Sequence, residues 1–183
     1  MTGFLDRDAA ERMAAEITIL EASIDRAAPS PVFSEFKSHW DRVRGERWAP
    51  SWRDFDPVDF HRLWRNLVLW DVEGDVHDFR VRMAGVGAVE FFGNDPTGQS
   101  IRDESFTPPH LFEQFYLFHS LSALWPGPVW FTGTMWYWKD RNHIPIQCMT
   151  LPLSDDGDRT TQTVNVWVFE SLDRGPPGPA ADR

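Results

Sequence analysis

Three strand-like runs in the second half of the chain constrain the fold more than any other feature. They span residues 129–138, 143–153 and 160–170, and apolar side chains dominate each of them. The two segments between them, residues 139–142 and 154–158, are short and polar and contain the residue types that form tight turns. Strands joined by such turns pair as antiparallel neighbours. The sequence therefore predicts three consecutive antiparallel strands here.

Two further strands are expected earlier in the chain. Residues 67–72 form a compact apolar run that ends near a turn signal. In the next run, Phe79, Val81 and Met83 alternate with more polar or smaller residues. Alternation with a period of two predicts a strand that buries one face.

Helices are expected between the second and third strands. Residues 86–92 form a short helical stretch that ends at Gly93, a residue type typical of helix C-termini. A longer helix begins after Thr107 and reaches about residue 124. Because a half-buried sheet must cover its apolar face, these helices are expected to pack on it. The predicted fold class is α+β, a five-stranded antiparallel sheet with helices on one face.

Residues 1–52 are predicted to form an N-terminal helical extension. Residues 4–26 carry apolar side chains at three- and four-residue steps, which predicts an amphipathic helix. That stripe either packs on its own domain or pairs with a second copy of the chain, and both interpretations stay open. Pro29 and Pro31 are expected to form a linker to a second helix at residues 34–44.

The domain itself is expected over residues 53–172. Asp56 followed by Pro57 predicts an N-cap and first turn of a short helix. Residues 173–183 are rich in glycine and proline, and a disordered tail is expected there.

Charge and cysteine content exclude several classes. The formal net charge of −10 opposes binding to a phosphate backbone, so no nucleic-acid partner is expected. The single cysteine, Cys148, cannot form an internal disulfide, which fits a reducing compartment. Neither a secretory signal nor a run long enough to span a membrane is present in the sequence. We expect a cytoplasmic protein without a membrane partner.

Three segments resemble PAS domains. Residues 85–93 are similar to the PAS helix that ends in Phe-Gly. Residues 97–101 are similar to the segment that leads into the next PAS helix. Residues 138–153 resemble a PAS hairpin whose second strand ends in Leu-Pro-Leu. The resemblance implies a PAS-like sheet and a sensing or signalling context. Residues 53–57, 80–85 and 92–98 are further similar to a bacterial family of stand-alone PAS-like proteins.

The resemblance leaves the cofactor unknown. Flavin-binding PAS domains that sense light carry an Asn-Cys-Arg motif, which this chain lacks, so a cysteine-linked flavin is not expected. Haem-binding PAS domains present a histidine from the long helix, where His119 stands with His110 beside it. The alternative is that His119 lies at the edge of the core and binds nothing. Asp155, Asp156 and Asp158 lack calcium-loop spacing and predict a solvated turn.

A small-molecule site is expected between the sheet and the helices. Aromatic side chains would line it, and a few polar groups would orient the ligand. The alternative is a tightly packed core without a cavity, and residues of opposite parity in one strand cannot all face one pocket. The candidate ligand-binding residues are Arg82, Phe91, Phe92, Tyr116, His119, Trp136, Trp138, Gln147 and Asn165.

Three functions are compatible with the sequence. The leading one is a stand-alone PAS-type sensor or signalling adaptor that binds a small ligand, a partner protein or both, and forms a homodimer through the N-terminal helix. The second is a small-molecule enzyme, an isomerase or hydrolase, with Glu90 or His119 as its general base. The third is a ligand-free structural adaptor. No catalytic or metal-binding motif is found, so we expect a protein that is not an enzyme.

Overall fold

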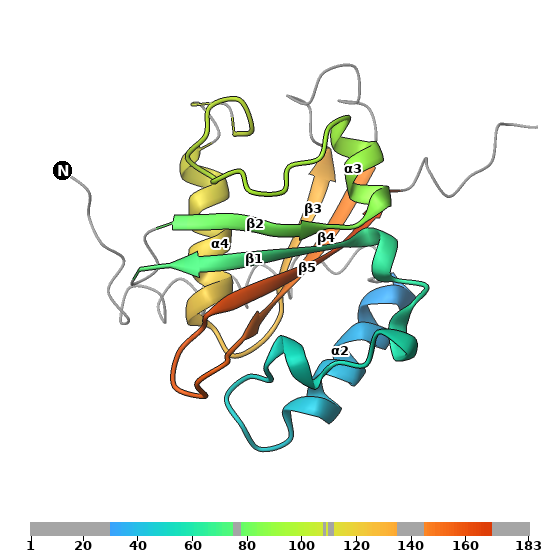
Figure 1. Cartoon of the computed structure of the whole chain (residues 1–183). Helices are drawn as coiled ribbons and strands as arrows, with labels where there is room; N and C mark the ends of the chain where they lie inside the picture. The colour runs from blue at the N-terminus through green and yellow to red at the C-terminus, as the bar shows by residue number, and fades with distance from the viewer. Residues whose placement is uncertain (1–29, 75–77, 108, 110–111, 135–144, 170–183) are drawn as a thin grey trace, which may run out of the picture.

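The sheet has five antiparallel strands in the order β2-β1-β5-β4-β3. The structure, a computed structural model, describes residues 30–74, 78–107, 109, 112–134 and 145–169 (Figure 1). The strands are β1 (Leu67–Glu73), β2 (Asp78–Ala84), β3 (Val129–Thr134), β4 (Pro145–Leu153) and β5 (Gln162–Phe169). The predicted α+β class and the five-stranded antiparallel sheet are confirmed. Residues 4–26, the distal part of the predicted 129–138 strand and the 173–183 tail lie outside the described residues.

The helical elements lie before β1 and between β2 and β3. They are α2 (Pro31–Arg44), the 3-10 helices η1 (Trp52–Asp54), η2 (Pro57–Phe60) and η3 (Trp64–Asn66), then α3 (Val86–Phe92) and α4 (Phe112–Leu124). The predicted N-cap is confirmed, because the Asp56 side chain accepts a hydrogen bond from the amide of Val58. Pro31 was wrongly assigned to a linker: it occupies the first turn of α2, where a missing amide hydrogen costs nothing.

Both faces of the sheet are covered by helices. Successive residues of a strand point to opposite faces, so Val68 and Trp70 pack in one cluster while Leu67 and Leu69 pack in another. The first cluster contains residues of α3 and α4, and the second contains Phe33, Phe36 and Trp40 of α2. We call these two sides the α4 face and the α2 face. On the α4 face the strands contribute Val68, Trp70, Phe79, Val81, Ile146, Cys148, Trp167 and Phe169, and on the α2 face Leu67, Leu69, Met149, Leu151, Leu153, Val164 and Val166.

A register shift in β2 changes which side chains share a face. Leu69 pairs with Met83 and Trp70 pairs with Val81, so Arg82 is the extra residue of a β-bulge. The predicted alternation holds for Phe79 and Val81, which lie on the α4 face. It is wrong for Met83, which packs against the α2 face because the bulge inserts one residue before it.

Two glycines determine how closely α3 approaches η3 and where α3 ends. A Cβ atom on Gly85 would lie 2.3 Å from the carbonyl oxygen of Trp64 and 2.4 Å from that of Arg65, so only glycine allows α3 to begin this close to η3. Gly93 adopts a left-handed conformation with φ of 77° after the last turn. The predicted C-terminal glycine of this helix is confirmed. Among the described helices, none is long and apolar enough to cross a bilayer.

Candidate functional site

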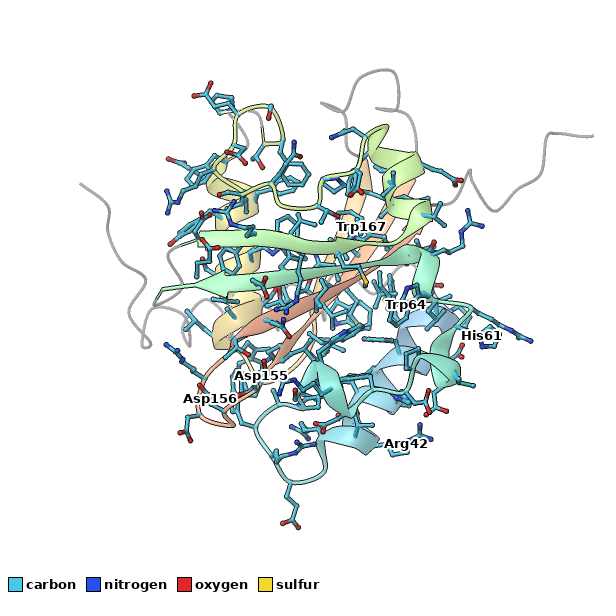
Figure 2. The ribbon with its side chains drawn as sticks, viewed as in Figure 1. Arg42, His61, Trp64, Asp155, Asp156 and Trp167 are labelled. Atoms are coloured by element: carbon cyan, nitrogen blue, oxygen red, sulfur yellow. The ribbon has the colours of Figure 1, made fainter. Side chains whose placement is uncertain are left out.

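The α4 face carries polar side chains at its centre. Asn165 pairs across the sheet with Val68 of β1 and Thr150 of β4, and it shares the parity of Trp167, a member of the α4-face cluster. Thr163 has the same parity and pairs with Trp70. Thr163 and Asn165 are both fully buried. Alternation along β5 therefore places Thr163, Asn165 and Trp167 on one face, and Figure 2 shows Trp167 inside the fold.

His119 reaches this region from α4. Its ring centroid lies 4.3 Å from that of Trp70 and 5.2 Å from that of Phe79, and only 1% of the residue is exposed. Burial lowers the pKa of His119 to about 3, because the surroundings cannot solvate an imidazolium. His119 is therefore a neutral group at physiological pH.

Several buried polar atoms in this region have no hydrogen-bond partner among the described residues. They are Trp70 Nε1, His119 Nδ1, Thr163 Oγ1, Asn165 Oδ1, Asn165 Nδ2 and Trp167 Nε1. Buried polar groups in native proteins are almost always paired with protein atoms or ordered water. Each unpaired one costs about 1–3 kcal/mol of desolvation free energy. The set combines indole and amide donors with carbonyl, hydroxyl and imidazole acceptors, so it can bind a neutral polar molecule or water.

Cys148 lies on the same face but offers no reactive thiolate. It is fully buried, and burial raises the pKa of its thiol above the ordinary value, while Thr150 and Asn165 beside it oppose that shift less strongly. Its Sγ lies 3.9 Å from Thr150 Oγ1. A thiol that stays protonated is a poor nucleophile, so this cysteine acts as a small apolar side chain.

Five of the nine predicted ligand-binding residues lie on the α4-face side. They are Phe91, Phe92, Tyr116, His119 and Asn165. Phe91 stacks on Phe169 with centroids 4.3 Å apart, and Phe92 meets Trp167 edge to face at 5.8 Å. Tyr116 is half-buried and meets Phe79 at 6.2 Å. Aromatic rings therefore surround the polar atoms.

Two of the other four predicted residues, Arg82 and Gln147, lie elsewhere. Arg82 is exposed at the bulge and forms an ion pair with Asp71 at 2.8 Å. Gln147 has the parity of Met149 on the α2 face, and its Oε1 accepts a hydrogen bond from the amide of Ser30 at 3.4 Å. Trp136 and Trp138 lie outside the described residues.

Trp70, Thr163 and Trp167 belong to the polar set but were not among the sequence candidates. A usable signal exists for two of them, because Thr163 and Trp167 stand two residues on either side of Asn165 in one strand. Trp70 has no such signal: it lies in an apolar run, and its proximity to His119 depends on how α4 packs.

The aspartates after β4 form a hydrogen-bonded turn. Asp156 Oδ1 accepts from the amides of Asp158 and Arg159 at 3.0 and 3.1 Å, and these bonds lower the pKa of Asp156. Asp155 accepts a hydrogen bond from the hydroxyl of Ser51. Figure 2 shows both carboxylates at the turn between β4 and β5. Within the described ranges, no group of three or more histidine, cysteine or acidic side chains could hold a metal ion.

Comparison with known proteins adds one structure and one family. The solved structure is that of the PAS domain from Bordetella pertussis BvgS, to which this chain is 17% identical, with a TM-score of 0.45, over 63% of this chain and 87% of that one. No curated protein matches the sequence significantly. Residues 29–114 match the family model described as PAS domain. This match, over residues 29–114, confirms the resemblance to PAS domains that the sequence predicts.

Proposed function

We propose that this protein is a PAS-type sensor or signalling adaptor whose input is a small neutral ligand bound between α4 and the α4 face. One observation carries the proposal, namely the set of buried polar atoms on and opposite that face that have no partner among the described residues. A ligand that pairs with them would recover the desolvation cost that they impose on the free protein.

The lining defines the chemistry of the ligand. The buried residues in the described part of the chain include none with a charged side chain, and His119 is neutral. A charged ligand would meet no compensating charge there and would lose its hydration. The indole hydrogens of Trp70 and Trp167 require acceptors on the ligand, and the surrounding rings favour a flat body. The proposed ligand is a neutral, planar molecule with both donors and acceptors.

A bound ligand would act by changing the position of α4 relative to the sheet. Thr160 Oγ1 donates to the carbonyl of Ala123 near the end of α4, which ties that end of the helix to the segment before β5. A ligand shifts the population of α4 positions only if it binds one more tightly than the others. The signal would then pass to a partner protein or to a second copy of the chain.

Native mass spectrometry of the full chain, compared with its denatured mass, tests the ligand. We expect excess mass on the native form, and we expect the Asn165→Leu variant to lose it. Met149→Leu, a conservative change on the α2 face, is the matched control and should retain it. A bare native mass together with no thermal stabilisation by a library of neutral heteroaromatic compounds would contradict the proposal and favour a ligand-free adaptor.

Homodimerisation through residues 4–26 is a separate part of the proposal and rests on the apolar stripe in the sequence. Deleting residues 1–30 should lower the oligomer size measured by light scattering. A full-length chain that is already monomeric would contradict this part alone and would leave the ligand proposal standing.

Binding is a better account of this region than catalysis. Glu90 is exposed and paired with Arg65 at 3.1 Å, so it is not in the region between α4 and the sheet. His119 has a pKa of about 3, far below the value that suits a general base near neutral pH.

A further inference from the structure

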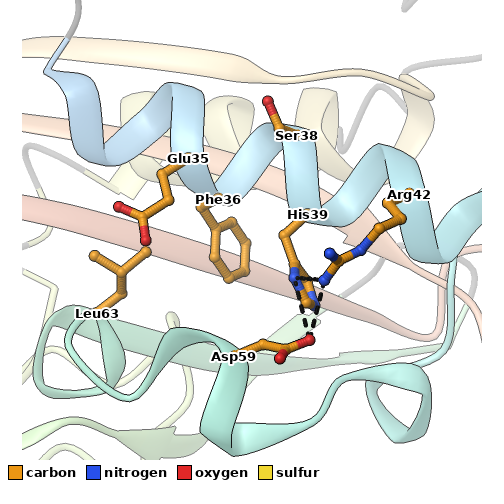
Figure 3. A pocket seen from close by; sticks show the side chains of 7 residues that line it. All are labelled: Glu35, Phe36, Ser38, His39, Arg42, Asp59 and Leu63. Carbon is orange, nitrogen blue, oxygen red and sulfur yellow. Dashed lines mark hydrogen bonds and ion pairs between the residues drawn. The ribbon is translucent and has the colours of Figure 1, made fainter.

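A pocket lies on the α2 side of the molecule, between α2 and η2. Its volume is about 450 Å³, within the range of small-molecule sites, and Figure 3 shows its lining. Phe36 of α2 and Leu63, between η2 and η3, are buried and form its apolar floor. Charged side chains stand around that floor, so the pocket differs in chemistry from the neutral α4 face.

A compact network occupies one end of this pocket. Arg42 Nη2 lies 3.0 Å from Asp59 Oδ2 and 2.6 Å from His39 Nδ1. His39 Nδ1 is 3.7 Å from the same carboxylate oxygen. Burial and the Arg42 charge lower the pKa of His39, and Asp59 opposes them less strongly. His39 is therefore neutral near pH 7, and the charges of Arg42 and Asp59 offset each other.

The opposite end of the pocket carries the Glu35 carboxylate, which has no ion-pair partner among the described residues. Glu35 precedes His39 by one helical turn, so both side chains project from the same side of α2, as Figure 3 shows. Glu35 makes no hydrogen bond or ion pair with the described part of the chain. Asp59 binds Arg42 through Oδ2 only, and its Oδ1 has no described partner. The pocket therefore has one net negative charge and two carboxylates with free acceptor positions.

We infer that this pocket binds a small organic cation, an ammonium or guanidinium group attached to an apolar body. The cationic group would lie against Glu35, and the apolar body would cover Phe36 and Leu63. An anion would meet repulsion from Glu35, whose charge nothing in the pocket lining offsets, and a neutral molecule would gain only the apolar contact. This site is on the other side of the sheet from the proposed input site, so either can fail without the other.

The test is a titration of the full chain by ¹H–¹⁵N NMR with three probes of one shape: 2-phenylethylammonium, 2-phenylethanol and phenylacetate. We expect the ammonium to give saturable shifts at the amides of α2 and η2, with a Kd on the order of 1–10 mM as befits its size. The alcohol should bind at least about fivefold more weakly, and the phenylacetate should give no shifts at these amides.

Glu35→Gln keeps the shape of the side chain and removes the charge, and the residue is exposed, so folding should be unaffected. This variant should weaken ammonium binding at least about threefold. Glu46→Gln removes an exposed carboxylate outside the pocket and is the matched control. Equal affinities for the three probes, or for the Glu35→Gln variant and the parent chain, would overturn the inference, as would shifts confined to other elements.

Discussion

The indole groups of the two sheet faces differ in their hydrogen bonding. On the α2 face, the Nε1 hydrogen of Trp40 is donated to the carbonyl of Pro152 at 2.9 Å. On the α4 face, the Nε1 groups of Trp70 and Trp167 have no described acceptor. All three residues are at most 4% exposed, so solvent does not replace the missing partners. The buried indole of the α2 face is thus paired, whereas the two of the α4 face stay unpaired among the described residues at a cost in free energy.

The clustering of the unpaired atoms strengthens this contrast. Thr163 and Asn165 alternate in β5 with Val164 and Val166 of the α2 face, and their own side chains point to the α4 face. His119 faces the same sheet surface from α4. Single unpaired atoms such as Arg44 Nε and Gln99 Oε1 lie elsewhere and are local features, whereas those of β1, β5 and α4 gather on one side and favour a site.

The largest expected effect concerns pH and His119. The pKa of His119 is about 3 in the folded chain, against an ordinary value of 6.5 for a solvated imidazole, so unfolded chains bind the proton first as the pH falls. The unfolding free energy is therefore independent of the protonation of His119 above pH 6.5. It falls progressively as the pH is lowered from 6.5 toward 3. Between pH 6.5 and about pH 5 the loss should be about 2 kcal/mol, measured by urea denaturation at each pH.

His119→Phe serves as the comparison for that measurement, because it removes the titrating group and keeps an aromatic ring. Its unfolding free energy should change much less over the same pH interval. His39 also has a lowered pKa, but it is present in both proteins and so cancels. Identical pH slopes would mean that His119 is solvated or paired in the folded chain, which would weaken the contrast between the faces.

A matched pair of tryptophan substitutions tests the contrast directly. Trp40→Phe and Trp70→Phe both shorten a buried ring, so their packing losses should be similar. Only Trp40→Phe also removes a hydrogen bond, and only Trp70→Phe removes an unpaired donor. Trp40→Phe should therefore be the more destabilising by about 1–2 kcal/mol in chemical denaturation. Equal losses of unfolding free energy would show that the Trp70 indole also donates a hydrogen bond of similar strength, for example to an ordered water.

Asn165→Leu should stabilise the ligand-free protein by about 1 kcal/mol, because it replaces an unpaired buried amide with an apolar side chain of similar size. The thermal midpoint of the ligand-free variant should rise accordingly. Gln162→Leu is the control on the same strand, since its side chain is buried but donates to Asp71 at 2.9 Å and should lose stability when replaced. A destabilised Asn165→Leu protein would indicate that the amide is satisfied in solution.

Local sequence patterns were sufficient for much of the fold. The polar turn at residues 154–158, the glycine after α3 and the cap at Asp56 depend on neighbouring residues, and their predictions agree with the structure. The bulge at Arg82 was not predictable, because an alternating run looks the same with or without an inserted residue until its partner strand is known. For that reason Met83 packs against the α2 face, whereas Phe79 and Val81 lie on the α4 face.

The candidate site was less predictable than the fold. Asn165 and His119 could be proposed because polar residues in a strand and on an aromatic helix are unusual. Gln147 was proposed on the same grounds, yet its position next to Cys148 in β4 gives it the opposite parity to the α4-face residues. Whether an indole has an acceptor depends on a carbonyl far away in the sequence, 112 positions for Trp40 and Pro152, and no local pattern contains that information.

The smallest expected effect concerns Arg82, the predicted ligand-binding residue that lies at the bulge. Its ion pair with Asp71 is exposed at 57% on the arginine side, so Arg82→Ala should change the unfolding free energy by about 0.5 kcal/mol or less. Because the guanidinium does not reach the α4 face, the variant should also retain any mass found on the native protein. Loss of that mass without loss of stability would place Arg82 in the ligand site after all and would extend the site beyond the α4 face.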